Sequence, residues 1–268
     1  MKTAESLVEI SRLEFITQDS HEKLLTCLQE KKVVVVRRAV DGSKIRQLVS
    51  NLVATDMEPS INHQMVDGVG NLHYKSGGIT SRSAYSAVDS SYYFFPWNYD
   101  STGICNEVDE MFAVVARLNG YDPEKLRLQI PSDGIIQRYH LICYPMGRGL
   151  ISPHSDPINV TRFTSGIYVT EFGRDYDWGG FYIFSQSGEK ISIDLAIRSG
   201  DLVLFAADLP HGVDAVMSRT CVPPDDLNFT GRIFLNMTIV ESHHRKNRET
   251  SRAYIPNCEN LKDIKPLK

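Results

Sequence analysis

Hydrophobic residues recur with two different periods along this 268-residue chain, and the change of period comes near Gly134. Before that point, apolar residues three and four positions apart form stripes that are typical of helices packed on a core. After it, short alternating or continuous apolar segments, rich in Val, Ile and Phe, indicate strands. Helices are expected at 20–30, 43–54 and 106–119, with one further turn opening at Asp122-Pro123, and a buried strand at 33–36.

Seven of the short segments beyond Gly134 are predicted to be strands, and Gly- or Pro-containing turns separate them. Many short strands with frequent turns are typical of a sandwich or barrel. The sequence therefore predicts a mainly β fold with flanking helices, of the α+β class. The strands are expected at 135–144, 162–171, 180–185, 190–196, 201–206, 213–217 and 232–241.

The segment 58–101 departs from both periods, because it is rich in Gly, Ser, Tyr and Asn and has no sustained pattern. Long irregular stretches inside a domain are uncommon and often serve as binding loops. We therefore expect three parts: residues 1–133 with helices and covering loops, a β core at 134–242, and a tail at 243–268. The polar tail is expected to pack loosely or fray.

Composition narrows the classes of function. The chain is 42% hydrophobic and 23% charged, which suits one large core. Its net charge of -4 argues against nucleic acid as a partner, since phosphate binding needs a basic surface. Five cysteines without a CxxC pair favour a reducing cytoplasm over a disulfide framework. The first residues lack the apolar core of a secretory signal, and no stretch approaches a membrane span.

The strongest chemical signal is the HSD motif of His154 and Asp156, which follows a Gly-rich turn. Alternate side chains of a strand point the same way, so one extended segment can direct both at one metal. His211, in the segment GDLVLFAADLPHGV, is a third candidate, and enough strands separate it from Asp156 for the chain to return beside its start. Two imidazoles and one carboxylate, with the other face open, form the ligand set of non-haem Fe(II) oxygenases.

Arg232 opens the alternating segment RIFLNMTIV and shares one face with Phe234, Asn236 and Thr238. A guanidinium on an inner face requires an anionic partner, because a buried unpaired charge is very costly. A dicarboxylate co-substrate would supply that partner. The alternative is an arginine at a strand end, paired with Asp225 or Asp226 or solvated.

The sequence resembles the Fe(II)/2-oxoglutarate-dependent oxygenase family over roughly residues 134–242. Four parts carry the resemblance: QRYHLICYPMGRG, the HSD motif, GDLVLFAADLPHGV and GRIFLNMT. It implies a double-stranded β-helix, or jelly-roll, core in which His154, Asp156 and His211 bind Fe(II). It also implies that Arg232 binds the distal carboxylate of 2-oxoglutarate, and that oxidation by O2 releases succinate and CO2.

Further candidates are expected around the same site. Gln137 and Tyr139 alternate on the strand 135–144 and could face the pocket, where Tyr139 could donate to a 2-oxoglutarate carboxylate; a core tyrosine is the alternative. In the region 58–101, aromatic residues with polar tips suit a small polar substrate, such as an amino acid or an aminoglycoside-like compound. The substrate-binding candidates are His73, Tyr74, Arg82, Tyr93 and Trp97.

Two other functions remain open at this point. A cupin-type metalloenzyme could use the same barrel without 2-oxoglutarate, and Arg232 would then have another role. A catalytically silent binding barrel would need the loss of a metal ligand, and none of the three is missing.

Overall fold

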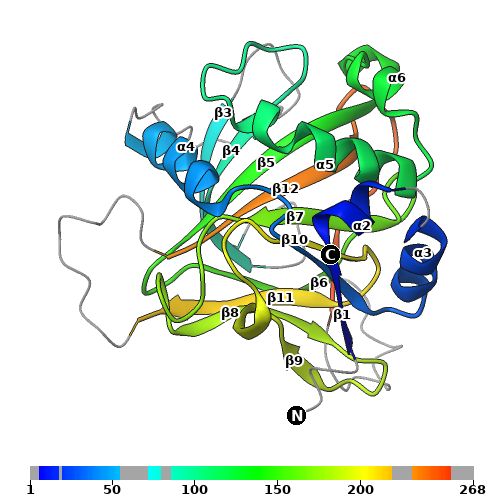
Figure 1. Ribbon diagram of the computed structural model, residues 1–268. Helices are drawn as coiled ribbons and strands as arrows, with labels where there is room; N and C mark the ends of the chain where they lie inside the picture. The colour runs from blue at the N-terminus through cyan, green and yellow to red at the C-terminus, as the bar shows by residue number, and fades with distance from the viewer. Residues whose placement is uncertain (1–5, 18–19, 55–71, 80–85, 219–230, 255–268) are drawn as a thin grey trace, which may run out of the picture.

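The computed structural model describes residues 6–17, 20–54, 72–79, 86–218 and 231–254 (Figure 1). Within them, thirteen strands form one folded sheet whose main path runs β1-β2-β10-β7-β12-β5-β4-β6-β11-β8-β9, with β3 beside β4 and β13 beside β6. All the strand pairs are antiparallel except β1 with β2. The strands are β1 Leu7–Ser11, β2 Val33–Arg37, β3 Leu72–Ile79, β4 Ser86–Phe94, β5 Ile135–Pro145, β6 Leu150–Ser155, β7 Phe163–Tyr168, β8 Trp178–Phe184, β9 Lys190–Ser192, β10 Leu202–Ala206, β11 His211–Met217, β12 Gly231–Glu241 and β13 Arg252–Ala253.

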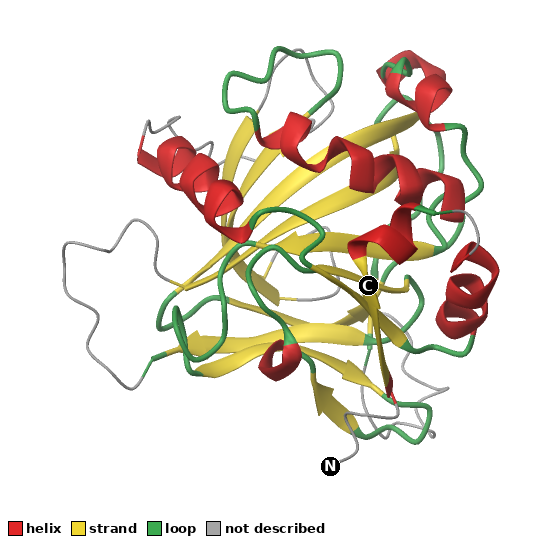
Figure 2. Cartoon of the chain, in the orientation of Figure 1, coloured by secondary structure: helices red, strands yellow, loops and turns green. Residues whose placement is uncertain are grey.

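The helices lie along the outer face of the larger half of this sheet, the half that contains β5, β12, β7 and β10 (Figure 2). The strands β6, β11, β8 and β9 form the smaller half, on the other side from the helices. The helices are α2 Arg12–Ile16, α3 His21–Gln29, α4 Gly42–Ala54, α5 Ile104–Leu118 and α6 Pro123–Arg127, and the 3-10 turns are η2 Pro131–Asp133 and η3 Asp194–Ala196.

Two hydrophobic clusters follow from this layering, and β12 shows how the sequence divides between them. Ile233, Leu235 and Met237 are buried in the cluster beneath the helices. Phe234 points the opposite way, into the cluster between the two halves of the sheet. Because successive side chains of a strand alternate in direction, one strand serves both the helix-covered core and the inner face.

The mainly β fold with flanking helices is confirmed, and so are the helices expected at 20–30, 43–54, 106–119 and 123 onward. The segment expected as a strand at 190–196 is shorter than predicted. Only Lys190–Ser192 pairs with β8, and the chain then turns as η3, which brings Asp194 inside.

The prediction that 58–101 is irregular is wrong for two parts of it, β3 and β4. β4 pairs with β5 and with β6, so it joins the two halves of the sheet. The composition of β4 does not indicate a strand, because the run SAVDSSYYF places Ser and Asp where an alternating strand would carry apolar residues. Residues 55–71 and 80–85 lie outside the described part of the chain.

The expectation of a loosely packed tail fails for residues 248–254, whereas residues 255–268 lie outside the described part of the chain. In this segment β13 pairs with β6 in the register Arg252–Ser155 and Ala253–His154. The tail therefore lies directly beside the HSD motif. Among the described residues, no helix is long and apolar enough to cross a membrane.

Candidate active site

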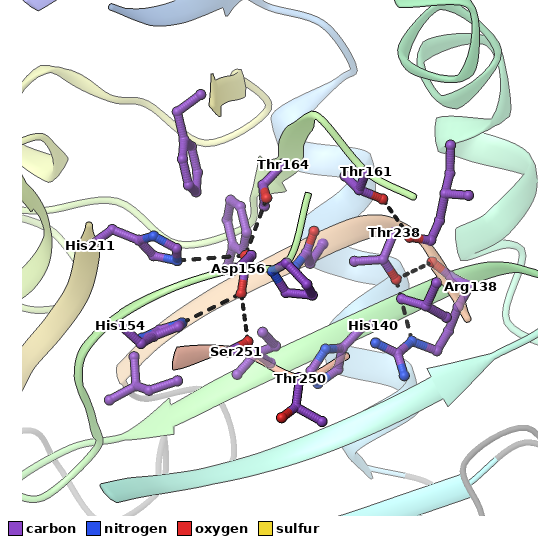
Figure 3. A pocket seen from close by; sticks show the side chains of 18 of the residues that line it. Arg138, His140, His154, Asp156, Thr161, Thr164, His211, Thr238, Thr250 and Ser251 are labelled. Carbon is purple, nitrogen blue, oxygen red and sulfur yellow. Dashed lines mark hydrogen bonds and ion pairs between the residues drawn. The ribbon is translucent and has the colours of Figure 1, made fainter. Parts of the chain in front are cut away.

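His154, Asp156 and His211 converge although 57 and 55 residues separate His211 from the other two. β11 pairs with β6 in a register that sets His211 opposite His154, and Asp156 follows directly after β6. The Nε2 atoms of His154 and His211 lie 3.8 Å from Oδ1 and Oδ2 of Asp156, respectively. Figure 3 shows both imidazoles pointing toward the carboxylate from one side of the cavity.

Backbone carbonyls determine which nitrogen of each imidazole can bind a metal. Nδ1 of His154 lies 2.9 Å from the carbonyl oxygen of Ser152, and Nδ1 of His211 lies 2.9 Å from that of Leu209. A carbonyl can only accept, so each Nδ1 carries the proton and each Nε2 keeps a lone pair. Burial, followed by the proximity of His154, lowers the pKa of His211 to about 4, which keeps this imidazole neutral.

Two hydroxyls hold the carboxylate. Ser251 Oγ donates to Asp156 Oδ1 at 2.8 Å, and Thr164 Oγ1 donates to Oδ2 at 3.2 Å. Burial opposes ionisation of Asp156 most strongly, but His211, His154 and these two hydrogen bonds together lower its pKa. The result is a carboxylate held in its anionic form with the Nε2 atoms of both histidines 3.8 Å away.

The donor atoms of the three residues lie within 4.8 Å of one another. One ion about 2 Å from each donor can bridge separations of this size after small adjustments. Two nitrogens and one carboxylate oxygen are the ligand set suited to non-haem Fe(II). The residues present therefore fit this metal, and they leave the cavity side open.

The triad faces a cavity of 330 Å³ whose floor is a ladder of cross-strand pairs between β12 and β5. In order along the strands the pairs are Arg232–Tyr144, Phe234–Ile142, Asn236–His140 and Thr238–Arg138, and all eight side chains line the cavity. The floor thus begins with Arg232 and continues with the apolar pair Phe234–Ile142. The remaining two pairs form its polar half, which contains the second arginine, Arg138. Thr164, which holds Asp156, is two residues from Gly166, the partner of Asn236 on β7, so the triad stands over the polar half.

Arg232 lies at the other end of this ladder and is 2% exposed. Its Nε donates to Oδ2 of Asp194 at 2.8 Å, and its Nη2 donates to the hydroxyl of Tyr168 at 2.7 Å. The anionic partner within the described residues is therefore Asp194, whereas Asp225 and Asp226 lie outside them. Asp194 also accepts from Tyr168 Oη, Tyr176 Oη and the backbone N–H of Phe181.

Arg232 still has donors to offer. A guanidinium carries five N–H groups, and those on Nε and Nη2 serve Asp194 and Tyr168. Nη1 donates to no residue among those described, and Arg232 lines the cavity. A carboxylate at this end would meet that remaining pair of N–H groups.

Gln137 and Tyr139 do not reach the cavity. Both are buried on the helix side of β5, where Gln137 Nε2 donates to Tyr139 Oη at 2.8 Å and Tyr139 Oη donates to Asp109 at 3.1 Å. The ring of Tyr139 packs edge-on against Phe112 of α5. The expected pocket face was thus off by one residue, and Arg138 and His140 occupy the positions assigned to Gln137 and Tyr139.

Of the three expected substrate-binding residues whose side chains the structure describes, His73, Tyr93 and Trp97, only Tyr93 lines the cavity, where it stacks on His140 with ring centroids 4.3 Å apart. His73 is buried instead, stacked on Tyr92 and 2.6 Å from Ser90 Oγ. Trp97 stacks on Phe95 and is not part of the cavity lining. Tyr74 is described only as a position of β3, paired with Ser91, and Arg82 lies outside the described residues.

Sequence reasoning missed the tail entirely. Arg248, Glu249, Thr250 and Ser251 line the cavity. Nothing in a polar, partly basic segment signals such a position, because the contact depends on the pairing of β13 with β6. Asp194 was missed for a similar reason, since the signal for it was only a buried arginine in need of a carboxylate.

Comparison with known proteins bears on the fold. No family model matches the sequence, and no curated protein does. Solved structures do match: a full-length Neurospora crassa protein in complex with alpha-KG has a TM-score of 0.55 at 14% identity, over 91% of this chain and 87% of that one. A Pseudomonas putida prolyl-4-hydroxylase has a TM-score of 0.51 at 16% identity, over 81% of this chain and 97% of that one.

A prolyl hydroxylase from Trichoplax adhaerens, crystallised with a peptide fragment, has a TM-score of 0.50 at 14% identity, over 83% of this chain and 91% of that one. The chain has the double-stranded β-helix fold of the 2OG-Fe(II) oxygenases. In that fold it carries an HxD…H group whose three side chains converge on the cavity.

Proposed function

We propose that this chain is an Fe(II)- and 2-oxoglutarate-dependent oxygenase that oxidises a small polar metabolite, most simply by hydroxylation. The observation that carries the proposal is the convergence of His154, Asp156 and His211 at a cavity that has Arg232 at its far end. The Neurospora crassa protein, which has the same fold, binds alpha-KG in its crystal structure. Together these features support Fe(II) and 2-oxoglutarate as the cofactor and co-substrate.

Bound Fe(II) with 2-oxoglutarate supplies the oxidation of substrate by O2, with release of succinate and CO2. The chain supplies the geometry. Ser251 and Thr164 hold the Asp156 carboxylate, and two backbone carbonyls hold the imidazoles so that Nε2 faces the metal position. Arg232 receives the far carboxylate of the keto-acid, held in place by Asp194 and Tyr168.

Apolar walls keep water from the space between the metal position and Arg232. Phe181, Phe205, Val203 and Phe234 line this part of the cavity, and all four are buried. A water-poor wall strengthens the electrostatic interactions inside it and limits side reactions. The polar half of the floor, by contrast, suits a substrate with hydrogen-bonding groups.

The test is release of succinate from 2-oxoglutarate. We expect it to require the purified protein, Fe(II) and 2-oxoglutarate together, and to be accelerated by the true substrate in a panel of amino acids, sugars and their derivatives. A mass increase of one oxygen in the product would identify hydroxylation, and a loss of two hydrogens would identify desaturation or ring closure. Absence of succinate under every condition would overturn the proposal.

A second function is worth testing because Asp194 already neutralises Arg232. A cupin-type metalloenzyme that does not use 2-oxoglutarate would need no free charge at that end of the cavity. Titration of the Zn(II)-loaded protein with 2-oxoglutarate separates the two, since Zn(II) supports binding without turnover. Saturable binding that depends on Arg232 favours the oxygenase, and the absence of binding favours the alternative.

A further inference from the structure

His140 and Asn236 are directly opposite each other on β5 and β12, and both line the polar half of the cavity floor. Neither has a part in binding the metal or the keto-acid as proposed above. Side chains paired in this way on one face of a sheet have Cβ atoms roughly 5 Å apart, so one small group can reach both.

A hydrogen-bond chain fixes which nitrogen of His140 carries the proton. Ser91 Oγ donates to Asp89 Oδ1 at 2.7 Å, and Nε2 of His140 lies 2.9 Å from Ser91 Oγ. An ionised carboxylate can only accept, so the one hydroxyl proton of Ser91 is committed to Asp89. Ser91 Oγ must then accept from His140, which places the proton on Nε2 and leaves Nδ1 as an acceptor.

The imidazole of His140 is neutral. Burial, followed by the charge of Arg138, lowers its pKa well below the usual value. Its plane is held by the stacked ring of Tyr93. Within the described residues Nδ1 has no hydrogen-bond partner, so the acceptor is unused.

Asn236 offers a second unused acceptor. Its Oδ1 is buried and has no hydrogen-bond partner among the described residues. A buried polar atom without a partner destabilises the fold, and a bound donor would recover that loss. Asn236 and His140 are opposite each other on the two strands and line the same cavity, so a single ligand group can approach both residues.

We propose that Nδ1 of His140 and Oδ1 of Asn236 form an acceptor pair that binds an uncharged N–H or O–H donor of the substrate, such as an amide, a lactam or a hydroxyl group. An ammonium group is a poorer match, because the guanidinium of Arg138 occupies the next step of the floor. The inference names the substrate class of the proposed oxygenase, and it rests on that function only for the use of the cavity as a substrate site.

The first test is the tautomer of His140, read by ¹⁵N NMR of the imidazole in the full chain loaded with Zn(II) and 2-oxoglutarate. We expect a neutral ring with the proton on Nε2 at pH 7.5. The probes are 2-pyrrolidinone and N-methyl-2-pyrrolidinone, which differ in one donor. The first should shift the Nδ1 resonance and bind roughly tenfold more tightly than the second. A proton on Nδ1, equal affinities, or no response to either lactam would overturn the proposal.

Variants separate this role from a structural one. Ser91→Ala removes the acceptor for the Nε2 proton of His140, so both tautomers should be populated and the preference for 2-pyrrolidinone should be reduced. Ser90→Ala, which removes the hydroxyl beside His73, should change neither the tautomer nor the preference. His140→Phe keeps a ring to stack on Tyr93 but has no acceptor, so it should abolish the preference; a preference that survives would contradict the assignment. The lactam titration needs no turnover, so a protein that makes succinate without discriminating refutes the acceptor pair alone. A protein that binds 2-pyrrolidinone more tightly than N-methyl-2-pyrrolidinone but makes no succinate refutes only the proposed oxygenase.

Discussion

At the Arg232 end of the cavity, Arg232, Asp194, Tyr168 and Tyr176 form a cluster of buried side chains that is closed in the sense that its opposite charges are paired, and among the described residues only Nη1 of Arg232 is left for a ligand. At the His140 end, the corresponding cluster of Asp89, Ser91 and His140 is open in a different way, because it terminates in a neutral acceptor that no described residue uses. Arg232 and His140 belong to the same ladder of residue pairs between β12 and β5.

The difference corresponds to two kinds of ligand. A closed cluster presents a rigid guanidinium, which suits a co-substrate that is the same in every turnover. An open one leaves its hydrogen bonds to be completed by the substrate, and a site that loses a partner rejects analogues lacking the matching group. The following predictions test how far the two ends are independent.

The largest effect is expected from His211→Ala, because turnover depends on the metal whichever end of the cavity binds its ligand. Loss of one imidazole should abolish tight Fe(II) binding and turnover. Metal content after dialysis and succinate formation measure this, and His244→Ala, at an exposed position, is the matched control. Normal turnover by the His211 variant would contradict the metal assignment.

Arg232→Ala should break the closed cluster and leave Asp194 as a buried, unpaired carboxylate. We expect unfolding free energy to fall by about 3–5 kcal/mol and the affinity for 2-oxoglutarate to fall roughly 100-fold. The double variant Arg232→Ala/Asp194→Asn should recover most of the stability but none of the affinity. Denaturant titration and calorimetry separate the two effects.

Arg37→Ala is the control for this cluster, because Arg37 also pairs with a buried carboxylate, Asp201, but lies away from the cavity. It should lose stability and keep the affinity for 2-oxoglutarate. If the double variant of Arg232 and Asp194 binds 2-oxoglutarate normally, the keto-acid is anchored by another residue.

Ser251→Ala should lower metal affinity by roughly 10- to 100-fold, since hydroxyls that orient a ligand typically contribute this much. The loss should appear in a Co(II) titration followed by its visible absorption. Ser187→Ala, an exposed serine bonded only to Ser185 within the described residues, serves as control. Unchanged Co(II) affinity would show that the tail does not support Asp156.

Asp89→Asn should have the smallest effect, on stability and its pH dependence. Burial raises the pKa of Asp89 to about 6 from its ordinary 3.8. Between about pH 4 and 6 the folded protein therefore binds more protons than the unfolded chain. The free energy of unfolding consequently falls as the pH rises through this window. The uncharged variant should be more stable by about 1 kcal/mol at pH 7.5 and lose this advantage near pH 4.

Denaturant titrations at both pH values measure the difference. Asp122→Asn, at an exposed helix cap where Asn serves as well as Asp, should show no such dependence. If the difference in unfolding free energy between Asp89→Asn and the wild type is the same at both pH values, Asp89 is not the titrating group.

The sequence predicted the parts of this molecule that depend on local periodicity. The stripes of apolar residues placed α3, α4 and α5, and the alternation of RIFLNMTIV separated the core side of β12 from the cavity side. The metal triad was also predictable, because an HxD spacing brings two ligands together on one extended segment. The strands that follow the motif allow the chain to return beside it, which places His211 opposite His154.

What could not be predicted depends on register between distant segments. Whether the odd or the even residues of β5 face the cavity follows from its pairing with β12. Gln137 and Tyr139 were therefore expected to face the cavity, whereas Arg138 and His140 line it. β4 and β13 carry too few apolar residues to be recognised, and the sheet, not their own composition, defines them. Asp194 gives no local signal at all, since its role comes from a turn that follows a three-residue strand.

The bond from Ser251 to Asp156 spans 95 residues. A ribosome that has translated as far as residue 247 has already made all three metal ligands, but not the hydroxyl that orients the carboxylate between them. Early iron capture by the nascent chain would therefore be weak, and full affinity would arise only after β13 has emerged and paired with β6.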